Sequence, residues 1–411
     1  MSPLKFVYAC LYCAMAMNYS VYSSNFLPNI IIVKYNKICT TLSIMVSSML
    51  INTISHLIFR RLLLAWYKLH QRCLPWRTTK DPYKIWLSEI ILQQTRVVQG
   101  LPYYERFIAQ YPSVVALSRA TEQDVLRLWQ GLGYYSRARN LHHCAQTIVE
   151  KYNGVFPTSY RSLLTLKGVG PYTAAAIAAV SFKEVVAAVD GNVYRVLARI
   201  FGLAYDIGTS QGRKQMHQFA TLLVDPIQPD TYSQAIMDFG ALQCTPVAPF
   251  CTTCIFNSYC LAFYTDRQKI LPVKTNKLHK RIRYFDYVIL QYKEVIYMKK
   301  RIKKDIWQGM YDFYLLENKQ RLLVDQMEDP LFRLAKSHHL SITTFEKEHA
   351  HLLTHQKLLV KFHKIEITPA FLQAANDLFY QFSLVAFNPS QIQILPKPIL
   401  IQNFLKKLNF V

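Results

Sequence analysis

The stretch LKGVGPYTA, residues 166–174, is the part of the sequence that says most about the fold. It places Gly168 and Gly170 directly before Pro171, a residue favoured at the first position of a helix. A tight turn of this kind exposes backbone N–H groups beside the positive end of a helix, where a phosphate can bind without any side chain. The alanine run over 174–179 allows that helix to pack closely. A purely structural turn would show the same pattern.

A second helix start follows at VDGNV, residues 189–193. An Asp that precedes a Gly and a new helix is most often an N-cap, so Asp190 is expected to cap this helix. The alternative is that helix-end N–H groups keep the Asp190 carboxylate ionised, so that it faces a developing cation. The local sequence leaves both interpretations open.

Upstream, Asp81 is suited to be an N-cap, and Pro82 is suited to the first position of a helix. Together they predict a helix over residues 83–97. Near its end lie two amides, Gln93 and Gln94. They are suited either to contact bases or simply to face solvent.

The same predicted helix carries a carboxylate within an apolar stripe. Ile85, Glu89 and Leu92 share one face by their spacing of four and three. Burial raises the pKa of a carboxyl group, as a general acid at neutral pH requires. A neutral Glu89 paired with a charged Asp190 would divide the work as in glycosidic bond cleavage. The alternative is a solvent-exposed Glu89 at the edge of the stripe.

Length and composition indicate two folded domains and a polyanionic partner. The 411 residues exceed one ordinary core, and 51% of them are hydrophobic, which excludes a single small module and a disordered chain. The formal charge of +23 favours phosphate contacts, with nucleic acid before an anionic membrane.

The nine cysteines are unevenly distributed, which argues against a disulfide framework and for a metal or cluster site in a reducing compartment. Four of them crowd into seventeen residues: Cys244, Cys251, Cys254 and Cys260. Four thiolates suit either zinc or an iron–sulfur cluster, and their chemistry alone does not separate the two.

Hydrophobic periodicity divides the chain into segments. Residues 57–265 have helical spacing, residues 266–283 form a charged linker, and strand-like alternation appears only in residues 284–411, which indicates an α+β domain.

The amino end, residues 1–56, is expected to be an extension outside the folded domains. Residues 6–33 and 38–59 contain no Lys, Arg, Asp or Glu, but polar residues interrupt both stretches. A signal peptide would need a cleaner apolar centre. We expect translation to begin at Met45 or Met49, with a membrane anchor or a disordered leader as alternatives.

Together and in this order, these motifs resemble the helix-hairpin-helix DNA glycosylases with a [4Fe-4S] loop, specifically the MutY-type adenine DNA glycosylases. The resemblance rests on the segments LPWR (74–77), WLSE (86–89), QQT (93–95), GLGYYSRARN (131–140), GVGPYT (168–173) and VDGNV (189–193), and on the four cysteines. The resemblance implies an all-α helix-hairpin-helix glycosylase domain with a [4Fe-4S] cluster held at 244–260, followed by an α+β Nudix-like domain. It also implies a bacterial cytoplasmic, nucleoid-associated monomer with no obligatory protein partner and no membrane contact.

The resemblance assigns catalytic roles residue by residue. Glu89 protonates adenine on its imidazole edge, and Asp190 stabilises the sugar cation or bonds to it transiently. Tyr172 and Asn192 order that site. Endonuclease III-type enzymes carry a nucleophilic Lys where this chain has Tyr172, and Tyr cannot form a Schiff base, so a monofunctional enzyme is expected. The alternatives are a bifunctional endonuclease III-like pyrimidine-lesion glycosylase/lyase and a catalytically dead mismatch binder.

DNA contacts follow from the same resemblance. Arg77 and Gln234 contact a flipped adenine, while Gln94 and Tyr134 fill or wedge the stack that it left; flipping is required because the reacting bond is inaccessible within the duplex. The implied substrate is double-stranded DNA with adenine opposite 8-oxoguanine or guanine, and the products are free adenine and an abasic site.

Residues 275–400 resemble, more faintly, the Nudix-like C-terminal domain of that family, which recognises 8-oxoguanine. WQGMYDF (307–313) and HLLTH (351–355) carry the resemblance, with Thr354 and His355 as the lesion contacts. Because the carboxylate-rich E-x-x-E-E core of active Nudix enzymes is absent from the sequence, this domain should bind a base without hydrolysing nucleotides.

Overall fold

The computed structural model describes residues 55–275 and 280–410. The expected extension, with its start at Met45 or Met49, lies outside the described residues except for its last two positions. From Phe59 onward the chain forms one compact unit. Within the part that is described, no helix is long and apolar enough to cross a membrane.

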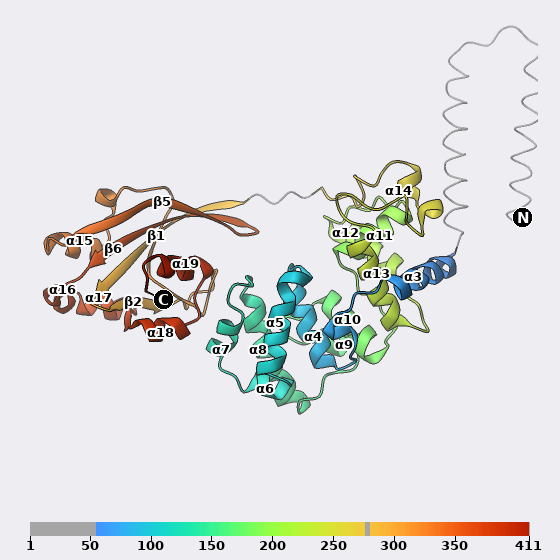
Figure 1. Cartoon of the computed structure of the whole chain (residues 1–411), viewed down its shortest axis with the longest axis horizontal. Coiled ribbons are helices and arrows are strands. Elements are labelled where there is room, and N and C mark those ends of the chain that lie inside the picture. Colours follow the sequence, from blue (N-terminus) through green and yellow to red (C-terminus); the bar gives the residue numbers. More distant parts are fainter. Residues whose placement is uncertain (1–54, 276–279, 411) are drawn as a thin grey trace, which may run out of the picture. The chain divides into compact units, whose positions relative to one another are not determined.

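Residues 57–265 are helical, as their periodicity predicts (Figure 1). The α-helices are α3 (His56–His70), α4 (Pro82–Leu92), α5 (Val97–Gln110), α6 (Val114–Ser118), α7 (Glu122–Leu128), α8 (Ser136–Tyr152), α9 (Tyr160–Leu163), α10 (Pro171–Phe182), α11 (Gly191–Ile200), α12 (Ser210–Leu223), α13 (Pro229–Leu242) and α14 (Leu261–Tyr264). Short 3₁₀ turns lie at η1 (Pro75–Arg77) and η2 (Asn257–Tyr259).

These helices enclose two hydrophobic cores. Trp86, Phe107 and Trp129 are fully buried in the first, which α4 to α8 and part of α10 surround. Leu63 and Phe239 are fully buried in the second, built around α3 and α11 to α13. Helix α10 packs against both α4 and α13, and its alanines are fully buried. The small side chains therefore bring elements of the two cores close together.

The helix predicted over 83–97 is shorter than expected. Asp81 accepts a hydrogen bond from the backbone N–H of Tyr83, which confirms the N-cap, but α4 ends at Leu92. The backbone then turns through Gln94, whose φ is +55°, and α5 begins at Val97. A residue in this left-handed region ends a helix.

The second part of the chain is α+β, as predicted (Figure 1). Its strands are β1 (Arg281–Tyr292), β2 (Val295–Lys300), β3 (Tyr311–Asp312), β4 (Tyr314–Asn318), β5 (Ile342–Leu352), β6 (Gln356–Glu366) and β7 (Val385–Phe387). The helices are α15 (Pro330–Ser337), α16 (Pro369–Ala374), α17 (Asn376–Gln381), α18 (Pro389–Ile394) and α19 (Ile399–Lys407), with a 3₁₀ turn η3 at Val324–Gln326.

Strand β1 is central to this sheet. Among the described residues the sheet has seven strands with the path β3-β2-β1-β6-β5, and β4 and β7 pair with β1 and β2. The pairing of β1 with β6 is parallel and the other pairings are antiparallel. Hydrophobic side chains of β1, such as Val288 and Ile289, are fully buried.

The linker predicted over 266–283 is too long at both ends. Leu271 is buried in the second helical core, and the Val273 carbonyl accepts a hydrogen bond from the N–H of Ile207. At the other end, Arg281 already pairs with Gln356 in the sheet. Charge and a proline suggested a linker, but backbone pairing and apolar burial order both flanks.

Candidate active site

A cavity of about 860 Å³ lies among α4, α10, α11 and α13. It gathers eight of the twelve residues predicted to act in catalysis or DNA contact: Arg77, Glu89, Gln94, Gly170, Tyr172, Asp190, Asn192 and Gln234. These positions span more than 150 residues of the chain. Their convergence on one hollow makes this cavity the candidate active site.

Glu89 enters the cavity from α4, with Ile85 and Leu92 of the same face also lining it. Burial raises the pKa of Glu89 to about 7, while a hydrogen bond from the Tyr172 hydroxyl and the charge of Arg77 oppose the rise. About half of such carboxyl groups are protonated at neutral pH, as general acid catalysis requires. The alternative of an exposed glutamate at the stripe edge does not hold.

Asp190 caps α11, which confirms the N-cap interpretation, and it also lines the cavity. Its Oδ1 accepts hydrogen bonds from the backbone N–H groups of Asn192 and Val193 at 2.8 and 2.9 Å. Its Oδ2 accepts one from Asn192 Nδ2 at 2.8 Å. Burial raises the pKa of Asp190, and these hydrogen bonds act against that rise. The ionised form thus has donors at both oxygens.

Arg195, which the sequence analysis missed, connects this carboxylate to the cysteine-rich loop. Its Nη2 donates to Asn192 Oδ1 at 2.8 Å, and its Nε donates to the backbone carbonyl of Cys244 at 2.7 Å. Because Asn192 Oδ1 accepts from Arg195, the Asn192 amide must present its Nδ2 to Asp190. A buried arginine five residues after Asp190 has no distinct sequence signal.

Arg77 and Gln234 are joined by a polar network that the sequence did not reveal. Arg77 Nη2 lies 2.7 Å from Oδ1 of the fully buried Asp238, and its Nη1 donates to the Tyr67 hydroxyl at 3.1 Å. That hydroxyl donates to Gln234 Oε1 at 3.0 Å. Asp238 is also paired with Arg72 at 2.6 Å. Arg77 and Gln234 are therefore held in fixed orientations at the cavity.

The glycine turn has the predicted form. Gly168 has a φ of +82°, and a Cβ at this position would lie 2.7 Å from the Cβ of Asn140. Gly170 is the N-cap residue of α10, which begins at Pro171 as expected. Gly170 lines the active-site cavity, whereas Gly168 lies outside it, near Asn140.

Tyr134, Thr354 and His355 do not reach that cavity. They line a second one of about 500 Å³, together with Arg139 and Trp307. Thr354 and His355 lie in the turn between β5 and β6.

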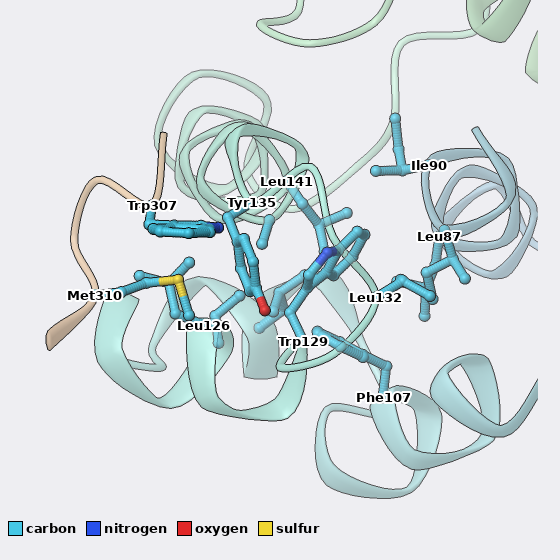
Figure 2. Close-up of a cluster of buried hydrophobic side chains, with 14 of the residues drawn as sticks. Leu87, Ile90, Phe107, Leu126, Trp129, Leu132, Tyr135, Leu141, Trp307 and Met310 are labelled. Carbon is cyan, nitrogen blue, oxygen red and sulfur yellow. The ribbon is translucent and has the colours of Figure 1, made fainter. Parts of the chain in front are cut away.

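The wall of the second cavity is fixed by packing. Trp307 and Met310 lie against the cluster that includes Leu126 and Tyr135 (Figure 2). Arg139 Nη1 donates to the backbone carbonyl of Gln308 at 2.7 Å. The WQGMYDF segment is thereby held beside the GLGYYSRARN segment.

The four clustered cysteines line one small cavity beside Arg199. Arg199 Nη1 lies 3.5 Å from Cys244 Sγ, and the backbone N–H of Phe256 donates to Cys254 Sγ at 3.4 Å. Over the described ranges, no group of three or more His, Cys, Asp or Glu side chains has the arrangement of a metal-ion site. The shared cavity and the N–H donors to sulfur nevertheless suit a group held by four thiolates.

Comparison with known proteins decides the family. Residues 87–221 match the HhH-GPD superfamily base excision DNA repair protein model. The chain is 31% identical over 357 residues to an adenine DNA glycosylase of Buchnera aphidicola subsp. Acyrthosiphon pisum (strain APS), covering 85% of this chain and 99% of that protein. The chain belongs to the adenine DNA glycosylase family.

An adenine DNA glycosylase of Rattus norvegicus is 42% identical over 213 residues, which cover 50% of this chain and 41% of that protein. Among solved structures, a thermostable thymine-DNA glycosylase aligns with 51% of this chain and 97% of its own, at 28% identity and a TM-score of 0.48. The adenine DNA glycosylase relatives and the family model confirm the predicted activity: the chain is a DNA N-glycosylase of base excision repair, a hydrolase.

Proposed function

We propose that this adenine glycosylase removes adenine that lies opposite 8-oxoguanine, or opposite guanine, in double-stranded DNA. In this proposal it is monofunctional and leaves an abasic site in an intact strand. The observation that carries the proposal is the convergence of Glu89, whose pKa is raised to about 7, and Asp190 on one cavity. One group is suited to give a proton and the other to face positive charge.

The reaction breaks the bond between adenine N9 and the sugar C1′. Glu89 donates its proton to the imidazole edge of adenine, so that the base leaves as a neutral molecule. Asp190 stabilises the positive charge that develops on the sugar, or bonds transiently to C1′. Water then adds to C1′ and its proton passes to a carboxylate. Tyr172, hydrogen-bonded to Glu89, orders the acid and offers no amine for a Schiff base.

Arg77 and Gln234 recognise the flipped adenine. Tyr67 donates to Gln234 Oε1. The Gln234 amide is thus oriented with its Nε2 donors free for an acceptor on the base. Asp238 fixes the Arg77 guanidinium in the same network. A pocket with preset donors rejects bases whose edges do not match.

The second cavity is the proposed site for 8-oxoguanine. Oxidation converts the N7 acceptor of guanine to an N–H donor beside the C8 carbonyl, and Thr354 offers a hydroxyl that can accept from that N–H. His355, Arg139 and Trp307 line the same cavity. The α+β domain, which we interpret as Nudix-like, then acts as a reader of the lesion strand.

Cys244, Cys251, Cys254 and Cys260 are proposed to hold a [4Fe-4S] cluster. When bound, the cluster cross-links the loop over 244–260 and contributes to stability and shape rather than to bond cleavage. Arg195 contacts the Cys244 carbonyl and Asn192. A loop shaped by the cluster would therefore also support the orientation of Asp190.

The proposed setting is bacterial DNA at the nucleoid in the cytoplasm, with the enzyme acting as a monomer and without an obligatory protein partner. The net charge of +23 supports binding to DNA, because arginine and lysine side chains that replace counterions on phosphates drive sequence-independent binding. Bacterial proteins are among its relatives.

A nicking assay tests the proposal. Duplex DNA that contains adenine opposite 8-oxoguanine is incubated with the full chain, then analysed with and without alkali. Strand cleavage only after alkali supports a monofunctional glycosylase. Cleavage without alkali would indicate a lyase, and no cleavage in either lane would indicate a protein that binds without catalysis.

A further inference from the structure

Arg137, which has no role in the mechanism above, lies in the first turn of α8 and is only 9% exposed. Its guanidinium donates to two separate loops. Nη1 contacts the carbonyls of Ile90 and Ile91 at 2.9 Å each and that of Gln93 at 2.6 Å. Nη2 contacts Thr95 Oγ1 and the carbonyl of Gly133, both at 3.3 Å.

The first loop is the end of α4 with the turn that follows it. The last carbonyls of a helix lack partners within the helix, and a glycine in the left-handed conformation is usual just beyond it. Here Gln94 occupies that conformation with a φ of +55°, although it carries a Cβ. Arg137 supplies hydrogen bonds to carbonyls on this turn. The Gln94 side chain is exposed and reaches the active-site cavity.

The second loop carries Tyr134. Gly133 and Tyr134 both have positive φ, at +78° and +50°, and the Gly133 carbonyl also accepts from Trp129 Nε1 at 3.0 Å. The centre of the Arg137 guanidinium lies 5.5 Å from the centroid of the Tyr134 ring and 5.1 Å from that of Trp129. Tyr134 is 40% exposed and lines the second cavity.

We propose that Arg137 is a positioning residue that holds Gln94 and Tyr134 as one rigid wedge, so that both enter the base stack together when adenine is extruded. This inference rests on the proposed wedge roles of Gln94 and Tyr134. Each would otherwise sit alone on a turn with positive φ, a conformation that a side chain disfavours. Through Arg137, the turn at the first cavity and the turn at the second share one anchor.

The chemistry of the anchor calls for arginine. Burial lowers the pKa of Arg137 to about 10, so that it is still charged at neutral pH. A planar guanidinium directs several donors in fixed directions, whereas an ammonium group is a single point. Arg137→Lys therefore keeps the charge but loses contact with one of the two loops.

The test uses the full chain and two duplexes. One carries 2-aminopurine in place of the adenine, because this base fluoresces when it leaves the stack, and the other carries adenine for the single-turnover rate. Arg137→Lys is expected to lower the fluorescence rise on binding and to slow single-turnover adenine release at least tenfold. In a Gln94→Ala/Tyr134→Ala background, Arg137→Lys should slow single-turnover adenine release by less than a further twofold. Thr95→Val removes the contact between Arg137 and Thr95 Oγ1. It should lower the fluorescence rise and the rate by a smaller factor, and it replaces Arg137→Lys in the test if that variant folds poorly.

Arg60→Lys is the matched control. Arg60 donates to the carbonyls of Leu222 and Leu223 at the end of α12, so it is another arginine at a helix end, remote from both cavities. It should leave the fluorescence signal unchanged.

Three results would overturn the inference. An equal loss of rate from Arg137→Lys in the wild-type and double-variant backgrounds, or an unchanged fluorescence rise, would reject the anchor while the wedge roles stand. If Gln94→Ala and Tyr134→Ala themselves leave the fluorescence rise unchanged, the wedge roles fail and the anchor is rejected with them.

Discussion

Glu89 and Asp190 line the same cavity, but Asp190 has more hydrogen-bond donors around its carboxylate. Asp190 accepts hydrogen bonds at both carboxylate oxygens from Asn192 and Val193. At Glu89 the largest influence is burial, which raises its pKa to about 7. The pair therefore combines a group that can hold a proton at neutral pH with one whose anionic form is solvated by the protein. This difference underlies the predictions for Glu89 and Asp190.

The rate of adenine release should depend on pH through Glu89. Its raised pKa, about 7, means that the protonated acid is the major form below that pH and is lost above it. We expect the single-turnover rate to fall about tenfold for each pH unit above 8. The measurement is a rate profile from pH 6 to pH 9 with enzyme in excess. A rate that does not change between pH 7 and pH 9 would contradict the assignment.

Asp190→Asn should inactivate the enzyme without unfolding α11. The amide oxygen can still accept from the backbone N–H groups, so the helix cap is kept. The negative charge that stabilises the sugar cation is lost. Asp329→Asn, at the N-cap of α15, is the control and should keep full activity. A rate for Asp190→Asn within about threefold of wild type, less than 1 kcal/mol, would place the role elsewhere.

Thr354→Val should reduce the preference for adenine opposite 8-oxoguanine over adenine opposite guanine. Valine keeps the shape and removes the hydroxyl, and one such contact contributes about 1–3 kcal/mol of discrimination. The ratio of the two binding constants should therefore fall by about 5- to 140-fold. Thr343→Val, at an exposed position of β5, is the control. An unchanged ratio would show that Thr354 does not read the lesion.

Cys251→Ser should lower the iron content, weaken DNA binding and reduce the yield of soluble protein. We expect wild-type protein to be yellow-brown, with about four iron and four sulfide per chain. Cys73→Ser, at an exposed cysteine away from the cluster loop, should retain the iron and sulfide of the wild-type protein. Colourless wild-type protein with one bound zinc would refute the iron–sulfur prediction.

Much of the fold was predictable because it depends on local signals. Apolar spacing predicted the helices, the Asp81 and Asp190 N-caps are confirmed, and the glycine turn before Pro171 has the expected conformation. Ile85, Glu89 and Leu92 line one cavity, as their spacing required. Whether Glu89 was buried was not predictable from its own helix, since η1, α10, α11 and α13 also line the cavity.

The features that escaped prediction depend on contacts between distant residues. The end of α4 at Leu92 involves Arg137, more than forty residues later. Arg195 and Asp238 are ordinary charged residues on helices until folding places them beside Asn192 and Arg77. Thr354 and His355 were grouped with the other DNA contacts, but they face a cavity separate from that of Glu89.

Adenine release by Glu89→Gln is the most direct test of the central claim, that Glu89 is the acid. The variant should fold at least as stably as wild type. A raised carboxyl pKa means that stability is lost as pH rises through about 4.5 to 7, and glutamine avoids this loss. Glu105→Gln, at an exposed position of α5, is the control. The account predicts that Glu89→Gln binds the mismatched duplex but releases no adenine in a single turnover; release at a near-normal rate would contradict it.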